Sequence, residues 1–88
     1  MSTPSWISNN TWIPDGTFLK VSRSSDERIV EGHVVDCRIY KGGEARGINN
    51  NHIYYLVYLD IGCEVCFTLD MATGSYVSGD MIIPLFEN

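Results

Sequence analysis

No stretch of this sequence carries the apolar period of a helix over a useful length, whereas several short segments alternate between apolar and polar residues. The clearest alternation runs over residues 63–70, where the odd-numbered side chains share one face. Turns rich in glycine, serine and aspartate separate the segments. Because closure of a sheet removes its exposed edges, the sequence predicts an all-β fold, a small barrel of five or six short antiparallel strands.

The expected strands cover residues 17–23, 29–40, 52–59, 63–70, 76–77 and 81–86. Glycine inside a strand marks a bulge or bend, and Gly32 is expected to play that part in the second strand. Residues 52–59 are nearly continuously apolar, which predicts a strand covered on both faces. The residues of the second strand expected on one face are Ile29, His33, Val35, Cys37 and Ile39.

A chain of 88 residues forms one domain with a thin core. Such a chain buries only about 60–65% of the surface that its unfolded form exposes, so oligomerisation or partner binding would supplement its stability. Residues 1–12 are polar apart from Met1, Pro4, an isoleucine and two tryptophans, and we expect a flexible N-terminal arm there. Residues 13–88 then form a single β-barrel domain.

The longest apolar run is far shorter than the roughly 18 residues that a membrane span requires. The first ten residues hold no cation and no apolar core of a signal peptide. We therefore expect no membrane partner and a cytoplasmic protein, in which the three cysteines are thiols.

The charges are distributed unevenly. All six cations lie in residues 1–46, together with six anions, whereas residues 47–88 contain five anions and no lysine or arginine. An acidic half favours partners with a basic surface and disfavours nucleic acid phosphates.

A bent strand, a variable loop and a hydrophobic strand that ends in Asp-x-Gly before another strand follow one another over residues 17–70. The residues concerned are Glu31-Gly32-His33-Val34-Val35, Tyr55-Leu56-Val57-Tyr58-Leu59-Asp60-Ile61-Gly62, and Cys63 through Leu69. This pattern resembles SH3-like barrels, and among them Tudor-type domains. The resemblance implies a barrel that binds through its loops. Ile61 stands where that family typically has an aromatic residue, so binding of methylated ligands is not carried over.

Cys63 and Cys66 have the spacing of zinc and redox pairs. An odd spacing in a strand places them on opposite faces, so we expect Cys63 in the core and Cys66 as a partly exposed thiol. The sequence predicts no metal site and no cofactor.

Neither His33 nor His52 lies near a recognisable nucleophile motif, and His33 is expected to be an interior residue. The carboxylates are scattered, and no glycine loop is arranged to hold phosphate. We expect no catalytic residues and no enzyme activity.

The leading hypothesis is a non-catalytic module that binds a protein with a basic surface. The loop of residues 41–51 is long for so small a domain, and such loops are often functional. A free-standing acidic domain of this kind would suit an inhibitor that occludes a basic site, as in proteins from viruses and mobile elements. The expected partner-binding residues are Lys41, Glu44, Arg46, Asn50, Asp60, Glu64 and Asp70.

Two alternatives remain. A nucleic-acid-binding barrel would use the cations of the first half, and tyrosines outside the core could stack on bases. A structural homo-oligomer would pair exposed strand edges. The cations of the first alternative are Lys20, Arg23, Arg28 and Arg38.

Overall fold

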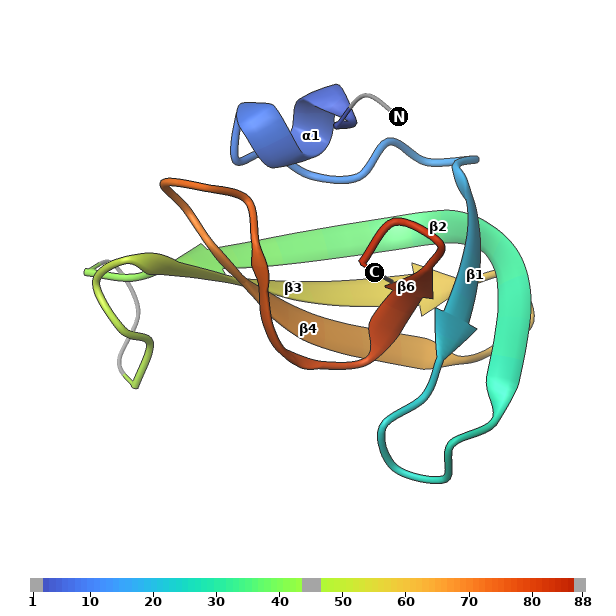
Figure 1. Cartoon of the computed structure of the whole chain (residues 1–88). Helices are drawn as coiled ribbons and strands as arrows, with labels where there is room; N and C mark the ends of the chain where they lie inside the picture. The colour runs from blue at the N-terminus through green and yellow to red at the C-terminus, as the bar shows by residue number, and fades with distance from the viewer. Residues whose placement is uncertain (1–2, 44–46, 87–88) are drawn as a thin grey trace.

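Six antiparallel strands form a nearly closed barrel in a computed structural model that describes residues 3–43 and 47–86. A short helix precedes them (Figure 1). The predicted all-β class and small barrel are confirmed, and the architecture is compatible with an SH3-like barrel. The elements are α1 (Ser5–Ser8), β1 (Phe18–Ser22), β2 (Ile29–Lys41), β3 (His52–Leu59), β4 (Glu64–Asp70), β5 (Tyr76–Gly79) and β6 (Met81–Ile83).

The strand order is β5-β4-β3-β2-β1-β6, and every neighbouring pair is antiparallel. β2 is long enough to belong to both halves of the barrel. Its first half pairs with β1 and its second half with β3, and Figure 1 shows it curving from one to the other. Within the part of the chain that the structure describes, no helix is long and apolar enough to cross a membrane.

A register shift interrupts β2 between Val34 and Asp36. The extra residue reverses the alternation of side chains along β2. Side chains in the first half of β2, which an unbroken strand would place on the same face as Cys37, therefore point to the opposite face. The prediction of one continuous face was therefore wrong, although Cys37 itself is buried and Ile39 partly buried. The residues that lie outside the core instead of in it are Ile29, His33 and Val35.

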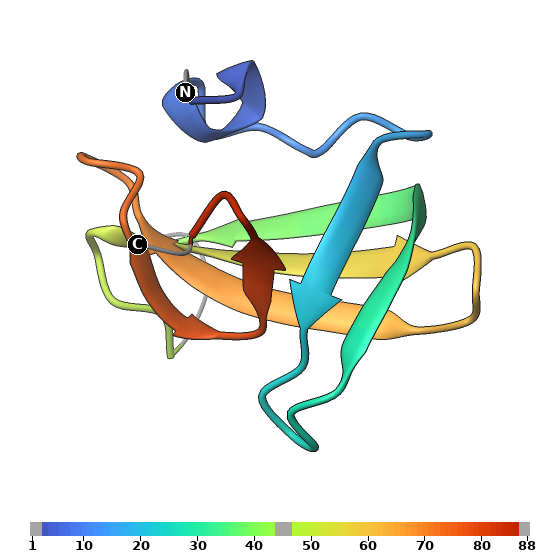
Figure 2. The same ribbon diagram turned by 45° about the vertical axis from the view of Figure 1, so that its right-hand side comes forward.

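Trp6 and Ile7, in the segment for which the sequence predicts a flexible arm, are buried. The Trp6 ring lies 5.3 Å from the ring of Tyr55 in an edge-on arrangement, and Tyr55 stacks on Phe67 at 4.9 Å. The Tyr55 hydroxyl donates to the carbonyl oxygens of Trp6 at 3.2 Å and Thr11 at 2.9 Å. Burial raises the pKa of this hydroxyl. The helix α1 thus packs on the inner side of the sheet (Figure 2).

The fully buried core comes mainly from alternate residues of the central strands. Their inward side chains meet between the two halves of the barrel. The largest fully buried side chains are Tyr55, Phe67, Ile13, Ile53, Leu69, Val21, Val34, Val57 and Val65.

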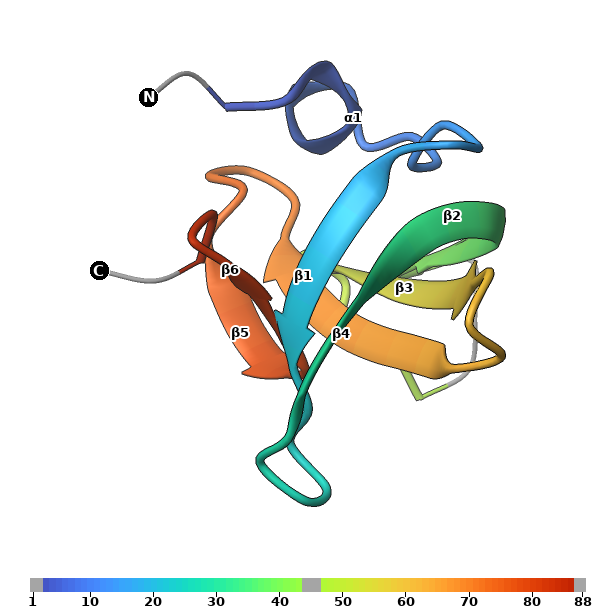
Figure 3. The same cartoon turned by 90° about the vertical axis from the view of Figure 1, so that its right-hand side faces the viewer.

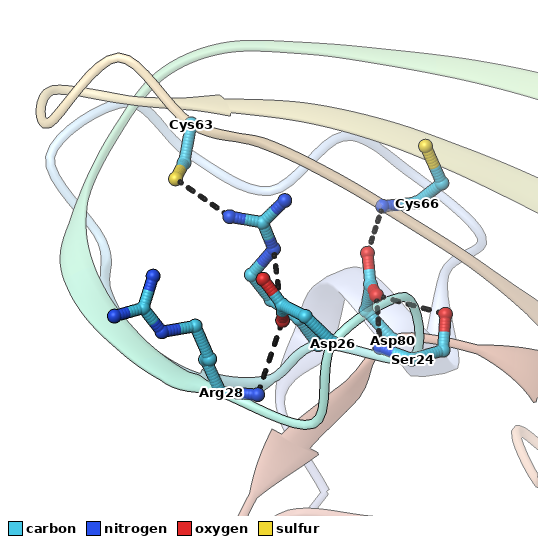
Figure 4. Close-up of polar contacts among 7 residues, drawn as sticks. Ser24, Asp26, Arg28, Cys63, Cys66 and Asp80 are labelled. Carbon is cyan, nitrogen blue, oxygen red and sulfur yellow. Dashed lines mark hydrogen bonds and ion pairs between the residues drawn. The ribbon is translucent and has the colours of Figure 1, made fainter.

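Asp80 closes the barrel. β5 pairs with β4 and β6 pairs with β1, so the chain crosses from one half to the other between Gly79 and Met81 (Figure 3). One Asp80 carboxylate oxygen accepts hydrogen bonds from the Ser24 N–H at 2.8 Å and the Ser24 hydroxyl at 3.2 Å. The other accepts the Cys66 N–H at 2.9 Å (Figure 4). One buried carboxylate therefore joins the β1–β2 hairpin to β4.

Gly79 makes this crossing possible. Its φ angle is +100°, and a Cβ there would lie 2.5 Å from the carbonyl oxygen of Cys66 and 2.8 Å from the Cα of Phe67. Any side chain would push β5 away from β4 and displace the Asp80 carboxylate from its donors.

Replacing Asp80 by asparagine should destabilise the fold by roughly 1–3 kcal/mol, because the amide nitrogen would face a backbone donor and leave it unpaired. Urea unfolding followed by fluorescence measures this change. Glu31→Gln, an exposed change of the same kind, serves as the control. An Asp80→Asn variant as stable as the control would contradict the closing role.

Candidate functional site

The outward side chains of β3 are half-buried, in contrast to the buried side chains that alternate with them. The expectation that this strand is covered on both faces was therefore wrong. The reason is that α1 packs on the inner side, where Trp6 meets Tyr55 and Phe67. The apolar character of the strand concealed which of its tyrosines belong to the core.

Three rows of outward side chains cross β2, β3 and β4 and define what we call the outer face. Residues opposite one another in antiparallel strands lie close enough to form one surface. The Tyr40 and Tyr54 rings, for example, lie 6.2 Å apart. The rows are Asp36, Tyr58 and Glu64; Arg38, Leu56 and Cys66; and Tyr40, Tyr54 and Thr68.

The tyrosines present aromatic rings on this face. Tyr54 lies beside the thiol of Cys66, and the hydrogen bond between them, together with partial burial and nearby acids, raises the pKa of Tyr54 to about 12. Desolvation raises the pKa of the Cys66 thiol as well. Both groups therefore stay uncharged at neutral pH.

The outer face is net acidic. Asp36 and Glu64 are exposed at one end, and the one cation among the nine residues is Arg38. The Arg38 Nε atom lies 3.8 Å from an Asp36 carboxylate oxygen, with both side chains more than half exposed. Exposed pairs of this kind are weak and rearrange readily.

A hollow of about 260 Å³ adjoins the outer face where part of the 41–51 loop approaches the sheet. The two sides of the loop approach each other closely. The Asn49 carbonyl group would collide with any side chain at position 42, and the chain has glycine there. At the hollow, part of the predicted loop therefore lies next to strands of the acidic half of the chain. It is lined by Gly47, Ile48, Asn49, His52, Tyr54, Thr68, Val77 and Ser78.

Of the loop residues predicted to bind a partner, Lys41 ends β2 and is half-buried, and Asn50 is exposed next to the hollow-lining residues. Glu44 and Arg46 lie outside the described residues. The structure therefore locates two of the four predicted loop residues, one near each end of the loop.

Asp60 serves the fold. Its N–H donates to the His33 carbonyl oxygen at 2.8 Å, and its carboxylate accepts the His33 N–H at 3.0 Å. The second carboxylate oxygen lies 3.3 Å from the His33 Nδ1 atom. A Cβ at Gly32 would lie 2.7 Å from this carboxylate, so glycine permits its approach. The hydrogen bond from the His33 backbone lowers the pKa of Asp60.

His33 is therefore an exposed partner of Asp60, and the prediction of an interior histidine was wrong. Its side chain is 55% exposed. Its ring lies 5.4 Å from that of Phe18, which is also exposed.

Asp70 also serves the fold. Its carboxylate accepts hydrogen bonds from the Ala72 N–H at 2.9 Å and from the Thr73 N–H at 3.1 Å. These bonds, the Thr73 backbone first, lower the pKa of Asp70. By contrast, the Glu64 side chain has, among the described residues, one hydrogen bond, a weak one from the Cys66 thiol at 3.8 Å. Among the three predicted acids, Glu64 is the one with least part in the fold.

Cys37 is buried, Cys63 and Cys66 are half-buried, and all three cysteines are free. Cys63 was expected in the core but lies before β4, where its sulfur accepts a hydrogen bond from Arg23 at 3.6 Å (Figure 4). Within residues 3–43 and 47–86, no three histidine, cysteine or carboxylate side chains gather as metal ligands.

Comparison of the chain with protein-family models, with curated proteins and with solved structures finds no match.

Replacing Asp70 by asparagine should lower stability at pH 7 and weaken the loss of stability in acid. The folded-state pKa lies below the ordinary value of 3.8, so the ionised carboxylate stabilises the fold above that pH. This contribution disappears as the pH falls through the lower folded-state pKa. Urea unfolding at pH 7 and at pH 2 measures both effects, and the two proteins should converge in acid.

Glu64→Gln is the matched control and should be as stable as the unaltered protein. Equal destabilisation by the two substitutions, or a difference for Asp70→Asn that persists unchanged in acid, would contradict the division between acids that support the fold and Glu64.

Proposed function

We propose that this protein is a non-catalytic protein-binding module whose outer face binds a partner with a basic surface. The observation that carries the proposal is the position of Tyr40, Tyr54 and Tyr58 on an acidic sheet face, opposite the side on which α1 packs. Half-buried tyrosines gain further burial when a partner covers them.

Tyrosine suits such a surface because it buries a large ring at a low entropic cost and keeps a polar hydroxyl at the edge. Aromatic residues are enriched among the few residues that dominate binding energy. The carboxylates at the edge would add to the rate and specificity of association with a basic partner. The ends of the 41–51 loop, with Lys41 and Asn50, lie where they can form the rim.

The inhibitor hypothesis is a finer form of the same proposal. A domain of this size that covers a basic site on a larger protein would inhibit it by occlusion alone. The resemblance of residues 17–70 to Tudor-type domains also belongs to the proposal, as does action in the reducing cytoplasm. The three free thiols are compatible with that compartment.

The test uses two exposed aromatic residues on different surfaces. Tyr40 lies on the outer face and is 38% exposed, whereas Phe18 lies beside His33 and is 54% exposed. We expect Tyr40→Arg to reduce capture of the partner by at least tenfold, a loss of about 1.4 kcal/mol, and Phe18→Arg to leave it unchanged. The measurement is affinity capture by the tagged protein from the cells that encode it, at low and moderate salt.

A stoichiometric protein that is lost with Tyr40→Arg alone would support the proposal. Nucleic acid that disappears as salt rises would instead favour the nucleic-acid-binding alternative. Recovery of the tagged protein alone, with concentration-dependent light scattering, would favour the homo-oligomer. Equal losses with both variants would contradict the assignment of the outer face.

A further inference from the structure

The row formed by Asp36, Tyr58 and Glu64 has a specific chemistry. The register of β2, β3 and β4 places Tyr58 directly between the two acids. Opposed residues in antiparallel strands have Cβ atoms about 4.5–5.5 Å apart, so Asp36 and Glu64 stand next to Tyr58 on its two sides. The acids are exposed and the tyrosine half-buried, and all three point outward.

The charge of this row is only partly balanced within the chain. One Asp36 carboxylate oxygen accepts a hydrogen bond from the Cys37 N–H at 3.0 Å, and the Arg38 Nε atom lies 3.8 Å from the other, with the Arg38 side chain 62% exposed. Glu64 forms no ion pair with any residue in the described ranges. Within the described residues, one exposed guanidinium approaches Asp36 and none approaches Glu64, which leaves net negative charge next to Tyr58.

We propose that Asp36, Tyr58 and Glu64 together bind an arginine side chain of the protein partner. This inference rests on the proposed function and names the chemistry of the partner at one point of the outer face. The guanidinium would lie on the Tyr58 ring and direct its N–H groups sideways toward the carboxylates. Because it is planar and has donors on several edges, arginine fits two flanking acceptors better than the ammonium of lysine.

The hollow next to Tyr54 is a less suitable place for this cation. Its lining contains no carboxylate, since its members are glycines, an isoleucine, a valine, hydroxyl residues, asparagine, histidine and tyrosine. The nearby Asp70 carboxylate already accepts hydrogen bonds from the following turn. Charge complementarity therefore favours the opposite end of the outer face.

The test is a titration of the isotope-labelled full chain, followed by NMR, with a twelve-residue peptide of alternating glycine and arginine. The lysine counterpart is the comparison. We expect chemical-shift changes centred on the Asp36, Tyr58 and Glu64 row and weaker binding of the lysine peptide. Asp36→Asn combined with Glu64→Gln should weaken binding of the arginine peptide by about tenfold, in the range of close charge pairs at interfaces.

Two further variants separate recognition from folding. Tyr58→Phe keeps the ring and should retain binding, whereas Tyr58→Leu should lose it. Glu31→Gln removes an exposed carboxylate from the first half of β2 and should have no effect. Urea unfolding of each variant confirms that the fold is intact.

Shift changes elsewhere on the outer face, or a titration unaffected by the double substitution, would overturn the arginine site while leaving the outer face as the proposed binding surface. Absence of any shift change on the outer face would also overturn the arginine site. The comparison of Tyr40→Arg with Phe18→Arg decides the proposed function separately, because neither residue belongs to the row.

Discussion

The carboxylate of Asp80 joins parts of the barrel that are distant in the sequence. It accepts hydrogen bonds from the hairpin between β1 and β2 and from the backbone of β4, at the place where the last strand passes from one half of the barrel to the other. Asp80 is 9% exposed, so its carboxylate is largely removed from water and the loss of one of its bonds is costly. The absence of a side chain at Gly79 allows β5 to approach β4 closely enough for these bonds to form. Closure of the barrel thus depends on one acid and the glycine before it.

This closure also determines which surface is left for a partner. Trp6 and Tyr55 fill the inner side of the sheet. The second half of β2, together with β3 and β4, presents its alternate residues on the outer side. The acids then divide by task. Asp60 ties the end of β3 to β2 and Asp70 holds the turn after β4, whereas Glu64 stands beside Tyr58 with its carboxylate largely free. The same barrel therefore uses carboxylates both to fix its turns and to give one face a negative charge.

The sequence predicts the all-β class and most strand positions because alternation and turn residues are local signals. Val65, Phe67 and Leu69 face the core as their spacing indicates. The bulge in β2 could not be placed, because Val34 and Val35 are both apolar and hide the change of phase. The buried helix was missed because Trp6 and Ile7, in a short and otherwise polar stretch, give no periodic signal.

The candidate site was predictable only in part. The acidic half and the loop were visible as composition, but charge alone does not distinguish Glu64 from Asp70. Aspartate just before a tight turn is a known signal for hydrogen bonding to the following backbone, and it could have identified Asp70 as a turn residue. The bond of Asp60 to His33 joins residues 27 positions apart and has no such local signal. The apolar run of β3 did not show that Tyr54 and Tyr58 lie outside the core, since that depends on where α1 packs.

The most direct test of the account is hydroxyl-radical footprinting of the captured complex against the free protein. The account predicts that Tyr40, Tyr54 and Tyr58 lose reactivity on binding. Trp12 and Phe18, which are 59% and 54% exposed away from the outer face rows, should remain reactive. Protection of Trp12 and Phe18 with unchanged reactivity of the three tyrosines would contradict the central claim that the outer face binds the partner.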